Sequence, residues 1–218
     1  MSSMLFDPAC RRCPRLAEFR EDSGRRYPGY HAAPVPAFGD EAPSWLIVGL
    51  APGMHGANRT GRPFTGDHAG IMLYQTLHEL GASSAAASES LDDGLSLFGV
   101  RITNAVKCLP PENKPTPAEA RTCNGFLRAE LAAHVGVKVL VALGRIAHDA
   151  ILDAAGESRG AYRFAHAAEH QLADGRWLVD SYHCSRYNTQ TKRLTTDMFR
   201  KVLARAQSLA VQSSEQAV

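Results

Sequence analysis

The fold of this chain is decided by the stretch Trp45-Leu-Ile-Val-Gly-Leu-Ala-Pro-Gly-Met-His-Gly-Ala-Asn-Arg-Thr-Gly-Arg-Pro-Phe-Thr-Gly-Asp67. It starts as an apolar run typical of a buried strand, and the segment that follows, 71–80, has helical apolar spacing. A long glycine-rich loop therefore follows a strand, which is where open α/β sheets bind ligands. The loop also carries a cation at Arg59, a ring at Phe64 and a carboxylate at Asp67, a mixture that a simple turn does not require.

Three further apolar runs have the length of strands, and helical patterns lie between them. Strands that alternate with helices predict a parallel, doubly wound sheet with helices on both faces. We therefore expect an α/β fold, a three-layer sandwich around a central four-stranded parallel sheet. The expected strands are 45–50, 100–106, 137–143 and 177–182, and the expected helices are 15–20, 67–81, one that starts at 116, 145–155 and 195–209.

The length and composition are those of one globular unit. A chain of 218 residues with 44% hydrophobic content can bury one sizeable core, and we expect a single domain over 1–218. Within it, 1–44 lacks long periodic patterns, and 210–218 is polar enough to be a frayed tail. No apolar run is long enough for a membrane span, and the first residues lack a signal-peptide pattern, so we expect a cytoplasmic protein without a membrane partner.

The small net charge of +2 conceals an uneven distribution. Only Asp67 and Glu112 oppose the cations of the segments that follow the expected strands. This basic edge suits a phosphate backbone or a phosphorylated ligand, and the alternative is a solvated rim. The cations are Arg59, Arg62, Lys107, Lys114, Arg145, Arg186, Lys192 and Arg193.

The five cysteines speak against a disulfide framework, because their number is odd. Cys10 and Cys13 form a close pair, whereas fourteen residues separate Cys108 from Cys123. Zinc sites usually bring two close pairs, and iron–sulfur clusters tolerate uneven spacing. A four-iron cluster, a zinc ion and unliganded thiols therefore remain open from the spacing alone. Cys184 is interpreted as a small buried residue.

Polar residues follow the expected strands at the edge where parallel strands deliver their loops. Asn104 ends the second strand, and His183 to Asn188 follow the fourth. Each could be a satisfied structural group, but their convergence with Phe64 and Asp67 indicates a site. The sequence lacks the fingerprints of P-loop nucleotidases, dinucleotide folds, zinc proteases and serine hydrolases.

These pieces form a series of motifs between Cys10 and the last helix. With them the chain resembles the uracil-DNA glycosylases, specifically the iron–sulfur family 5 (UDGb-type) branch; Leu50 and Ala51 distinguish it from family 4, whose loop resembles Gly-Glu-Ala-Pro-Gly. The motifs are Cys10-x-x-Cys13-Pro, Gly49-Leu-Ala-Pro-Gly-x-His-Gly, Asn58-Arg-Thr-Gly-Arg-Pro-Phe-Thr-Gly-Asp67, Thr103-Asn-Ala-Val-Lys-Cys108, Pro110-Pro-Glu-Asn-Lys-Pro-Thr-Pro117, Ala142-Leu-Gly-Arg145 and His183-x-Ser-Arg-x-Asn-Thr-Gln-Thr191.

The resemblance implies a DNA-repair enzyme that acts as a monofunctional glycosylase. Such an enzyme flips uracil, and other deaminated bases such as hypoxanthine, out of double-stranded DNA and hydrolyses the N-glycosidic bond, leaving an abasic site. It also implies the fold of the uracil-DNA glycosylases. We expect the protein to be a monomer. Finally, it implies one structural four-iron four-sulfur cluster, bound by Cys10 and Cys13 of an N-terminal cluster-binding segment, 1–44, and by Cys108 and Cys123.

The resemblance also implies roles for single residues. Asp67 would orient or deprotonate the water or stabilise the sugar cation, His183 would donate a hydrogen bond to the departing base, and Asn113 matches a family 5 active-site asparagine. Phe64 would stack on the base and Asn104 would read its edge. Further contacts to base and phosphates are expected from Gly49, Ala51, Gly53, Ser185 and Asn188.

Two departures from the family pattern are Cys184 and Tyr187. Tyr187 could insert into the duplex or anchor its loop, and we favour the anchor. Ala51 stands where other branches have a polar residue that activates water, which shifts this role toward Asp67. The competing functional class is a non-catalytic iron–sulfur protein that binds nucleic acid and senses redox state.

Overall fold

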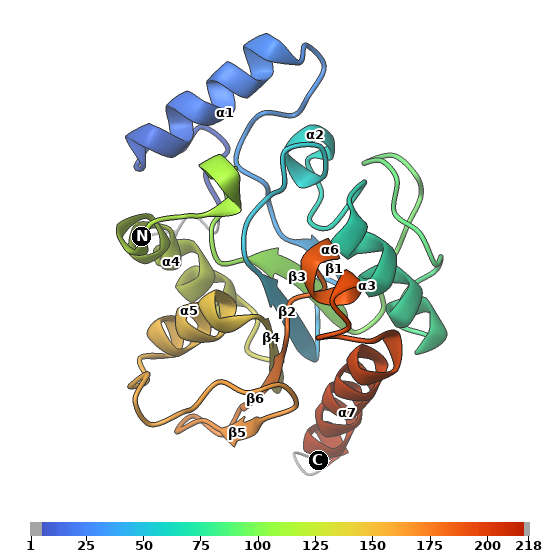
Figure 1. Cartoon of the computed structure of the whole chain (residues 1–218). Helices are drawn as coiled ribbons and strands as arrows, with labels where there is room; N and C mark the ends of the chain where they lie inside the picture. The colour runs from blue at the N-terminus through green and yellow to red at the C-terminus, as the bar shows by residue number, and fades with distance from the viewer. Residues whose placement is uncertain (1–5, 216–218) are drawn as a thin grey trace.

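The computed structural model describes residues 6–215, with side chains up to Ser213. Its centre is one six-stranded sheet in the order β1-β3-β2-β4-β6-β5 (Figure 1). The four inner strands are parallel to one another, and both edge strands run antiparallel to their neighbours. The strands are β1 (Phe38–Gly39), β2 (Trp45–Gly49), β3 (Val100–Asn104), β4 (Val139–Leu143), β5 (Glu169–Gln171) and β6 (Trp177–Ser181).

Helices cover both faces of the sheet and give three layers. Helices α4 and α5 pack together on one face, and α3 and α7 pack together on the other (Figure 1). The expected α/β fold with four central parallel strands is therefore confirmed. The helices are α1 (Pro14–Arg26), α2 (Ala57–Thr60), α3 (His68–Glu79), α4 (Pro117–Ala133), α5 (Arg145–Ala155), α6 (Arg186–Gln190) and α7 (Thr196–Glu215), with a 3₁₀ turn η1 at Pro111–Asn113.

The two central strands, β2 and β4, are apolar on both faces, as a sheet covered on two sides requires. In β2, Trp45 and Ile47 join the core beneath α3 and α7, and Leu46 and Val48 join the core beneath α4 and α5. Strand β2 pairs with β3 on one side and with β4 on the other, so it lies at the middle of the parallel strands. Burial of each large apolar side chain here contributes about 1.5–3 kcal/mol.

The two edge strands were not predicted. Strand β1 lies within 1–44, where the sequence shows no long periodic pattern, and β5 lies between the expected helix 145–155 and the expected strand 177–182. Strands of two and three residues are too short to show alternation, so no sequence pattern marks them. The sheet is therefore mixed at its edges rather than parallel throughout.

Helix ends differ from expectation in two places. Helix α1 extends to Arg26 instead of Arg20, and α7 extends to Glu215 instead of Leu209. The first part of the expected frayed tail is thus helical, and 216–218 lie outside the described residues. Two expected starts are confirmed: the Asp67 side chain accepts a hydrogen bond from Gly70 at the start of α3, and Thr116 and Glu119 form a capping box on α4.

The carboxyl ends of the parallel strands lie at one edge of the sheet and deliver the loops expected to carry the chemistry. Across residues 6–215, no helix is both long and apolar enough to cross a bilayer.

Candidate active site

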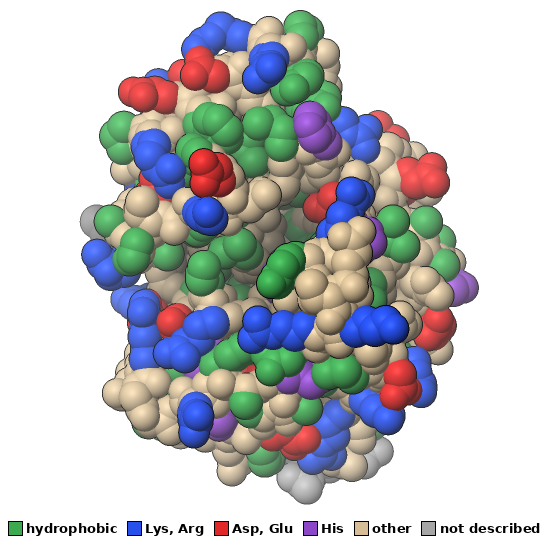
Figure 2. Space-filling view, in the orientation of Figure 1, with side chains coloured by type: hydrophobic (Ala, Val, Ile, Leu, Met, Phe, Trp, Pro, Cys, Tyr) green, Lys and Arg blue, Asp and Glu red, His purple; other side chains and the backbone are tan. Residues whose placement is uncertain are grey.

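A cavity of about 530 Å³ lies at the carboxyl edge of the four parallel strands. Segments that follow β2, β3, β4 and β6 all contribute to its wall. Its volume falls in the range of roughly 300–1,000 Å³ that is usual for sites of small ligands. In Figure 2 the molecule is hollowed near its centre, between the positions of α2, α5 and α6 in Figure 1. The cavity is therefore large enough to receive a single base.

The cavity brings together most of the residues that the sequence singled out. Phe64, Asp67, Asn104, Asn113 and His183 all line it. They come from the loop before α3, from the end of β3, from η1 and from the segment after β6. Ala51, Gly53 and Ser185 also line it.

Two of the expected substrate-binding residues, Gly49 and Asn188, do not line the cavity but support residues that do. A Cβ atom at Gly49 would lie 2.5 Å from both Asn104 Oδ1 and Phe64 Cζ, so the glycine lets these two side chains approach the backbone of β2. Asn188 donates from Nδ2 to the backbone carbonyl of His183 at 2.8 Å. Both residues thus position groups that line the cavity.

Asp67 serves the fold and the cavity at once. Its Oδ1 atom accepts a hydrogen bond of 2.9 Å from the backbone N–H of Gly70 and caps α3. Burial raises the pKa of Asp67, although backbone N–H groups of Gly70 and Ala69 and the nearby His68 act in the opposite direction. Its carboxyl group is therefore held in an environment that resists ionisation, which is a frequent property of functional carboxylates.

His183 is held as a neutral imidazole. Burial lowers the pKa of His183 to about 4, so the ring is uncharged at neutral pH. It stacks on Phe64 with ring centroids 6.0 Å apart and an interplanar angle of 26°. Within the described residues, the rings of His183 and the amide of Asn104 have no hydrogen-bond partner, so both groups are free to meet a ligand.

Two residues of the site have left-handed backbone angles that bulky side chains rarely adopt. Phe64 has a φ of 56°, and Asn113 has a φ of 56° next to Glu112 at 54°. A non-glycine residue in this region costs about 1–3 kcal/mol and persists where the surrounding structure imposes it. The strain falls at two positions of the cavity wall, which supports its functional character.

The basic edge is smaller than the sequence predicted. Arg62 is 3% exposed and forms an ion pair of 2.6 Å with Asp93, and Lys107 is 1% exposed and forms an ion pair of 2.6 Å with Glu130. These two residues therefore do not contribute to a cationic surface, and their inclusion was wrong. The exposed members are Arg59, Lys114, Arg145, Arg186, Lys192 and Arg193, and Lys and Arg side chains lie along the lower margin of the hollow in Figure 2.

His68 is the member of the site that the sequence argument missed. It lines the cavity beside Asp67, and its Nε2 atom lies 2.9 Å from Thr189 Oγ1 in α6. The partner is far away in the sequence, so no spacing connects the two. Its position directly after Asp67 was the one available signal.

The four cysteines of the expected metal site lie together, away from the cavity. Cys10, Cys13, Cys108 and Cys123 all line one small void of about 20 Å³ between α1, α4 and the segment after β3. None forms a disulfide. No group of three His, Cys, Asp or Glu side chains within residues 6–215 is placed to hold a metal ion. Cys184 is fully buried, as expected.

Two N–H groups point at sulfur atoms of this four-cysteine site. The backbone N–H of Lys107 donates to Cys123 Sγ at 3.2 Å, and Arg20 Nη1 donates to Cys108 Sγ at 3.2 Å. Burial raises the pKa of the Cys123 thiol to about 12 and also raises the pKa of Cys108. Hydrogen-bond donors directed at buried sulfur are the usual surroundings of metal-bound thiolates.

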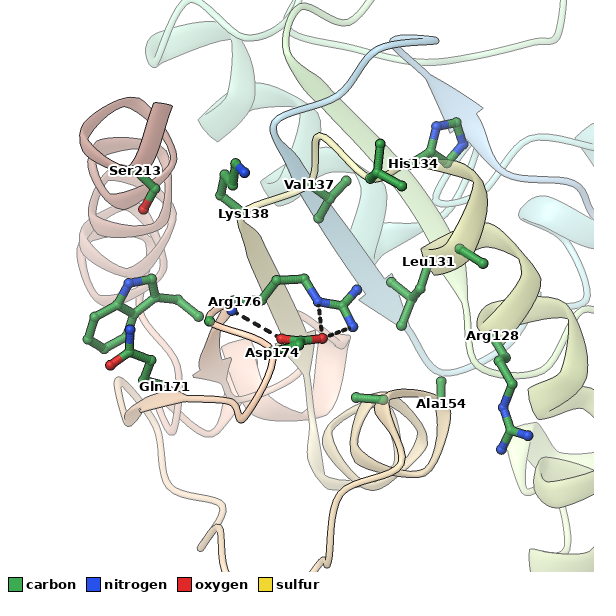
Figure 3. A pocket seen from close by; sticks show the side chains of 15 residues that line it. Arg128, Leu131, His134, Val137, Lys138, Ala154, Gln171, Asp174, Arg176 and Ser213 are labelled. Atoms are coloured by element: carbon green, nitrogen blue, oxygen red, sulfur yellow. Dashed lines mark hydrogen bonds and ion pairs between the residues drawn. The ribbon is translucent and has the colours of Figure 1, made fainter. Parts of the chain in front are cut away.

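A second cleft, of about 630 Å³, lies at the opposite edge of the sheet (Figure 3). Lys138 and Trp177 enter it from the amino ends of β4 and β6, and Arg176 donates from Nε to Asp174 at 2.7 Å within it. None of the residues expected to act on a ligand lies in this cleft. The carboxyl-edge cavity is therefore the candidate active site.

Comparison with known proteins assigns the fold to a family. The model of the uracil DNA glycosylase superfamily matches residues 36–207. A type-5 uracil-DNA glycosylase of Thermus thermophilus is 52% identical over 93% of this chain and 94% of its own length. Type-5 uracil-DNA glycosylases of Pyrobaculum aerophilum and Mycobacterium bovis are 43% and 42% identical, over 90% and 92% of this chain and 87% and 78% of theirs.

Proposed function

Because this chain belongs to the uracil DNA glycosylase superfamily and matches type-5 members over most of its length, we propose that it excises uracil from DNA. It is a hydrolase of DNA repair that cleaves the N-glycosidic bond between uracil and deoxyribose. One observation carries the assignment: a base-sized cavity joins a partly buried carboxylate, a neutral histidine and an aromatic ring at the carboxyl edge of the sheet.

Access to the bond requires that the uracil leaves the base stack. The flipped base would enter the cavity with one face toward Phe64, an interaction worth about 1–3 kcal/mol in comparable systems. The edge of the base would then face the Asn104 amide, which is 3% exposed and has both a donor and an acceptor to offer. Arg145 and Arg186 at the margin would contact phosphates on either side.

Cleavage separates charge, and the cavity supplies a group for each sign. As the bond between C1′ and N1 breaks, its electron pair moves onto the base, and the neutral His183 ring would donate an N–H to O2 of the departing uracil anion. A preorganised donor of this kind contributes about 3–4 kcal/mol to the transition state. A doubly protonated ring is not needed, because an uncharged imidazole already provides one N–H.

Asp67 would act on the opposite side of the sugar. Its carboxylate would stabilise the positive charge that develops at C1′ and orient the water whose oxygen forms the new bond to C1′. The proton that leaves this water passes to Asp67 or to solvent, and the released base anion is protonated by solvent. Asn113, at the same cavity, would fix the water or the base from η1.

Tyr187 is better explained as a wedge than as the loop anchor favoured from the sequence. Its side chain is 70% exposed on α6, and within the described residues its hydroxyl has no hydrogen bond and its ring no aromatic or cation–π contact. An anchoring tyrosine would be packed or hydrogen-bonded. An exposed ring directly after Arg186, a residue that lines the cavity, instead suits insertion into the gap that a flipped base leaves.

We also propose that Cys10, Cys13, Cys108 and Cys123 hold one four-iron four-sulfur cluster. The arrangement fits such a group: four free cysteines line one void, and the Lys107 N–H is directed at Cys123 Sγ. A cluster places its own atoms between the ligands, so the sulfurs need not approach as closely as around a single ion. When bound, the cluster would be structural, since the void lies apart from the cavity.

Finer features of the activity rest on the same cavity. Its volume of about 530 Å³ also admits hypoxanthine, so we propose that other deaminated bases are excised from duplex DNA.

One chain supplies the cavity, its basic margin and the cysteines, which supports action as a single-domain monomer. A cytoplasmic location would give it access to the substrate. A purely DNA-sensing protein would not require a base-sized cavity that holds a carboxylate.

The test is a strand-break assay on end-labelled duplexes. Duplexes with G·U, with hypoxanthine, or with normal pairs only are incubated with the protein and then treated with alkali. We expect a break at uracil and a slower break at hypoxanthine, with the normal duplex intact. An intact G·U strand at every salt concentration would refute the activity, whereas an intact hypoxanthine strand alone would restrict the substrate range.

A further inference from the structure

Arg20 lies in the middle of α1 and is one of the most buried cations of the chain. It is 5% exposed, and Nη1 donates to Cys108 Sγ at 3.2 Å and to the Cys10 backbone carbonyl at 3.0 Å. No carboxylate pairs with it among residues 6–215. Its two contacts therefore both lead to residues of the four-cysteine site.

The other deeply buried cations have carboxylate partners. Arg62 pairs with Asp93, and Lys107 pairs with Glu130. A buried charge without a counter-charge is strongly unfavourable, and proteins avoid it by pairing or metal coordination. A guanidinium group carries a positive charge in proteins. The missing negative charge is therefore expected at the sulfur atom that the Arg20 side chain contacts, Cys108 Sγ.

We propose that Arg20 is the charge-compensating residue of the four-cysteine site. This inference rests on the cluster proposed above, whose four thiolates give it a net negative charge. The guanidinium would offset part of that charge through Cys108 Sγ, hold the oxidised cluster in place, and favour its reduction by balancing the added electron.

Helix α1, which contains Arg20, also contacts the segment that leads to Asp67. Three residues after Arg20, Ser23 is buried at 3% exposure. Its Oγ accepts from Asn58 Nδ2 at 3.0 Å and donates to Met54 Sδ at 3.3 Å. Both partners belong to the segment between β2 and Asp67, with Asn58 in α2. Arg20 thus fastens to the cluster a helix that also supports the active-site loop.

Four variants of the anaerobically purified holoenzyme test the proposal. Arg20→Gln and Arg20→Met remove the charge, and Met retains the apolar length of the side chain. Arg20→Lys keeps the charge without the planar fork. Arg25→Gln is the matched control, because Arg25 is an exposed cation of the same helix whose one ion pair among the described residues is with Asp22. Iron and sulfide content, the reduction potential and the half-life of the visible absorbance in air are measured.

We expect Arg20→Gln and Arg20→Met to shift the reduction potential to more negative values and to lose the absorbance roughly tenfold faster than wild type. Arg20→Lys should keep a potential close to that of wild type, and Arg25→Gln should match wild type in both measurements. A methionine variant with wild-type potential and half-life would show that only the volume of the side chain matters, and would overturn the proposal.

A measurement on the wild-type protein covers the case in which the charge-removing variants do not fold. Pulsed electron paramagnetic resonance of the reduced protein labelled with ¹⁵N-arginine should show coupling of a guanidinium nitrogen to the cluster, and its absence would overturn the proposal. Wild-type protein without iron would refute the cluster itself. Loaded wild-type protein with unshifted variants would refute only the role of Arg20.

Discussion

The Nε2 atom of His68 and the Oγ1 atom of Thr189 lie 2.9 Å apart and join α3 to α6, two helices that each contribute a residue to the wall of the active-site cavity. His68 begins α3 directly after Asp67, and Thr189 lies in α6, the helix that carries Arg186 and Tyr187. This bridge therefore connects the carboxylate proposed to act on the sugar with the helix proposed to contact the DNA. We propose that it keeps the two in register.

Removal of the bridge should slow catalysis without unfolding the protein. A hydrogen bond of this kind contributes about 0.5–1.5 kcal/mol, so Thr189→Val should lower the single-turnover rate of uracil release about 2- to 10-fold. Thr191→Val is the control: in the part of the chain that the structure describes, the Thr191 hydroxyl donates only to backbone carbonyls at the end of α6. Equal slowing in both variants would indicate damage to α6 itself and would contradict a specific role of the bridge.

Tyr187 should act on base flipping rather than on bond cleavage. Stacking of an inserted ring contributes about 1–3 kcal/mol, and the alanine variant lacks it. The Tyr187→Ala protein should therefore flip and excise uracil from duplex DNA roughly 5- to 150-fold more slowly than wild type. Flipping is followed by the fluorescence of 2-aminopurine placed next to uracil. Tyr187→Phe should match wild type, and single-stranded substrate should be little affected. An alanine variant that is slowed equally on single strands would refute the wedge.

Gly49→Ala should distort the wall of the cavity. The new methyl group would meet Asn104 Oδ1 and the Phe64 ring, and such overpacking costs about 1–3 kcal/mol. We expect a lower melting temperature and slower uracil release, because both side chains must move. Gly125→Ala is the matched control: this α4 glycine has open space around it, so alanine should stabilise the helix by up to about 1 kcal/mol. Unchanged activity of the Gly49 variant would contradict this packing role.

The stability of the protein should depend on pH in opposite ways at His183 and Asp67. Burial lowers the pKa of His183 from 6.5 to about 4, so between these values the unfolded chain binds a proton that the native state does not. Stability from this group is therefore lost as the pH falls from 6.5 toward 4. The pKa of Asp67 is raised, so protonation of Asp67 at falling pH favours the native state.

Urea denaturation of wild type and His183→Gln at a series of pH values separates the two effects. The variant lacks the acid-sensitive ring, so its free energy of unfolding should decline less than that of wild type between neutral pH and the lowered pKa. Asp67→Asn should be more stable than wild type at neutral pH, because it removes a partly buried carboxylate whose pKa is raised by desolvation but keeps a good helix cap. Parallel pH curves for wild type and His183→Gln would contradict the burial of that ring.

Most of the fold could be predicted, because the sequence patterns that mark its strands and helix ends are local. Runs such as Val139–Leu143 are apolar on both faces, which marks inner strands of a covered sheet, and Asp67 and Thr116 are recognisable caps. The edge strands β1 and β5 escape this reasoning, since two or three residues cannot show a period. The ends of α1 and α7 also escape it, because tertiary packing extends them past their clearest apolar positions.

Those site residues whose positions follow from the ends of the parallel strands could be predicted from the sequence. Phe64, Asp67, Asn104 and His183 meet because parallel strands deliver their loops to one edge. Long-range pairings could not be predicted in this way. Arg62 was taken for a surface cation because its partner Asp93 lies on a distant excursion, and the Glu130 partner of Lys107 lies on α4.

The most direct measurement is the single-turnover release of free uracil from a G·U duplex by wild type and by Asp67→Asn, with DNA affinity measured in parallel. Asparagine retains the cap on α3, so the fold should be preserved while the charge is lost. We predict that wild type releases uracil and that Asp67→Asn binds the duplex equally well but releases uracil about 100-fold or more slowly. A variant rate close to that of wild type would remove Asp67 from the mechanism and contradict the proposed chemistry of the cavity.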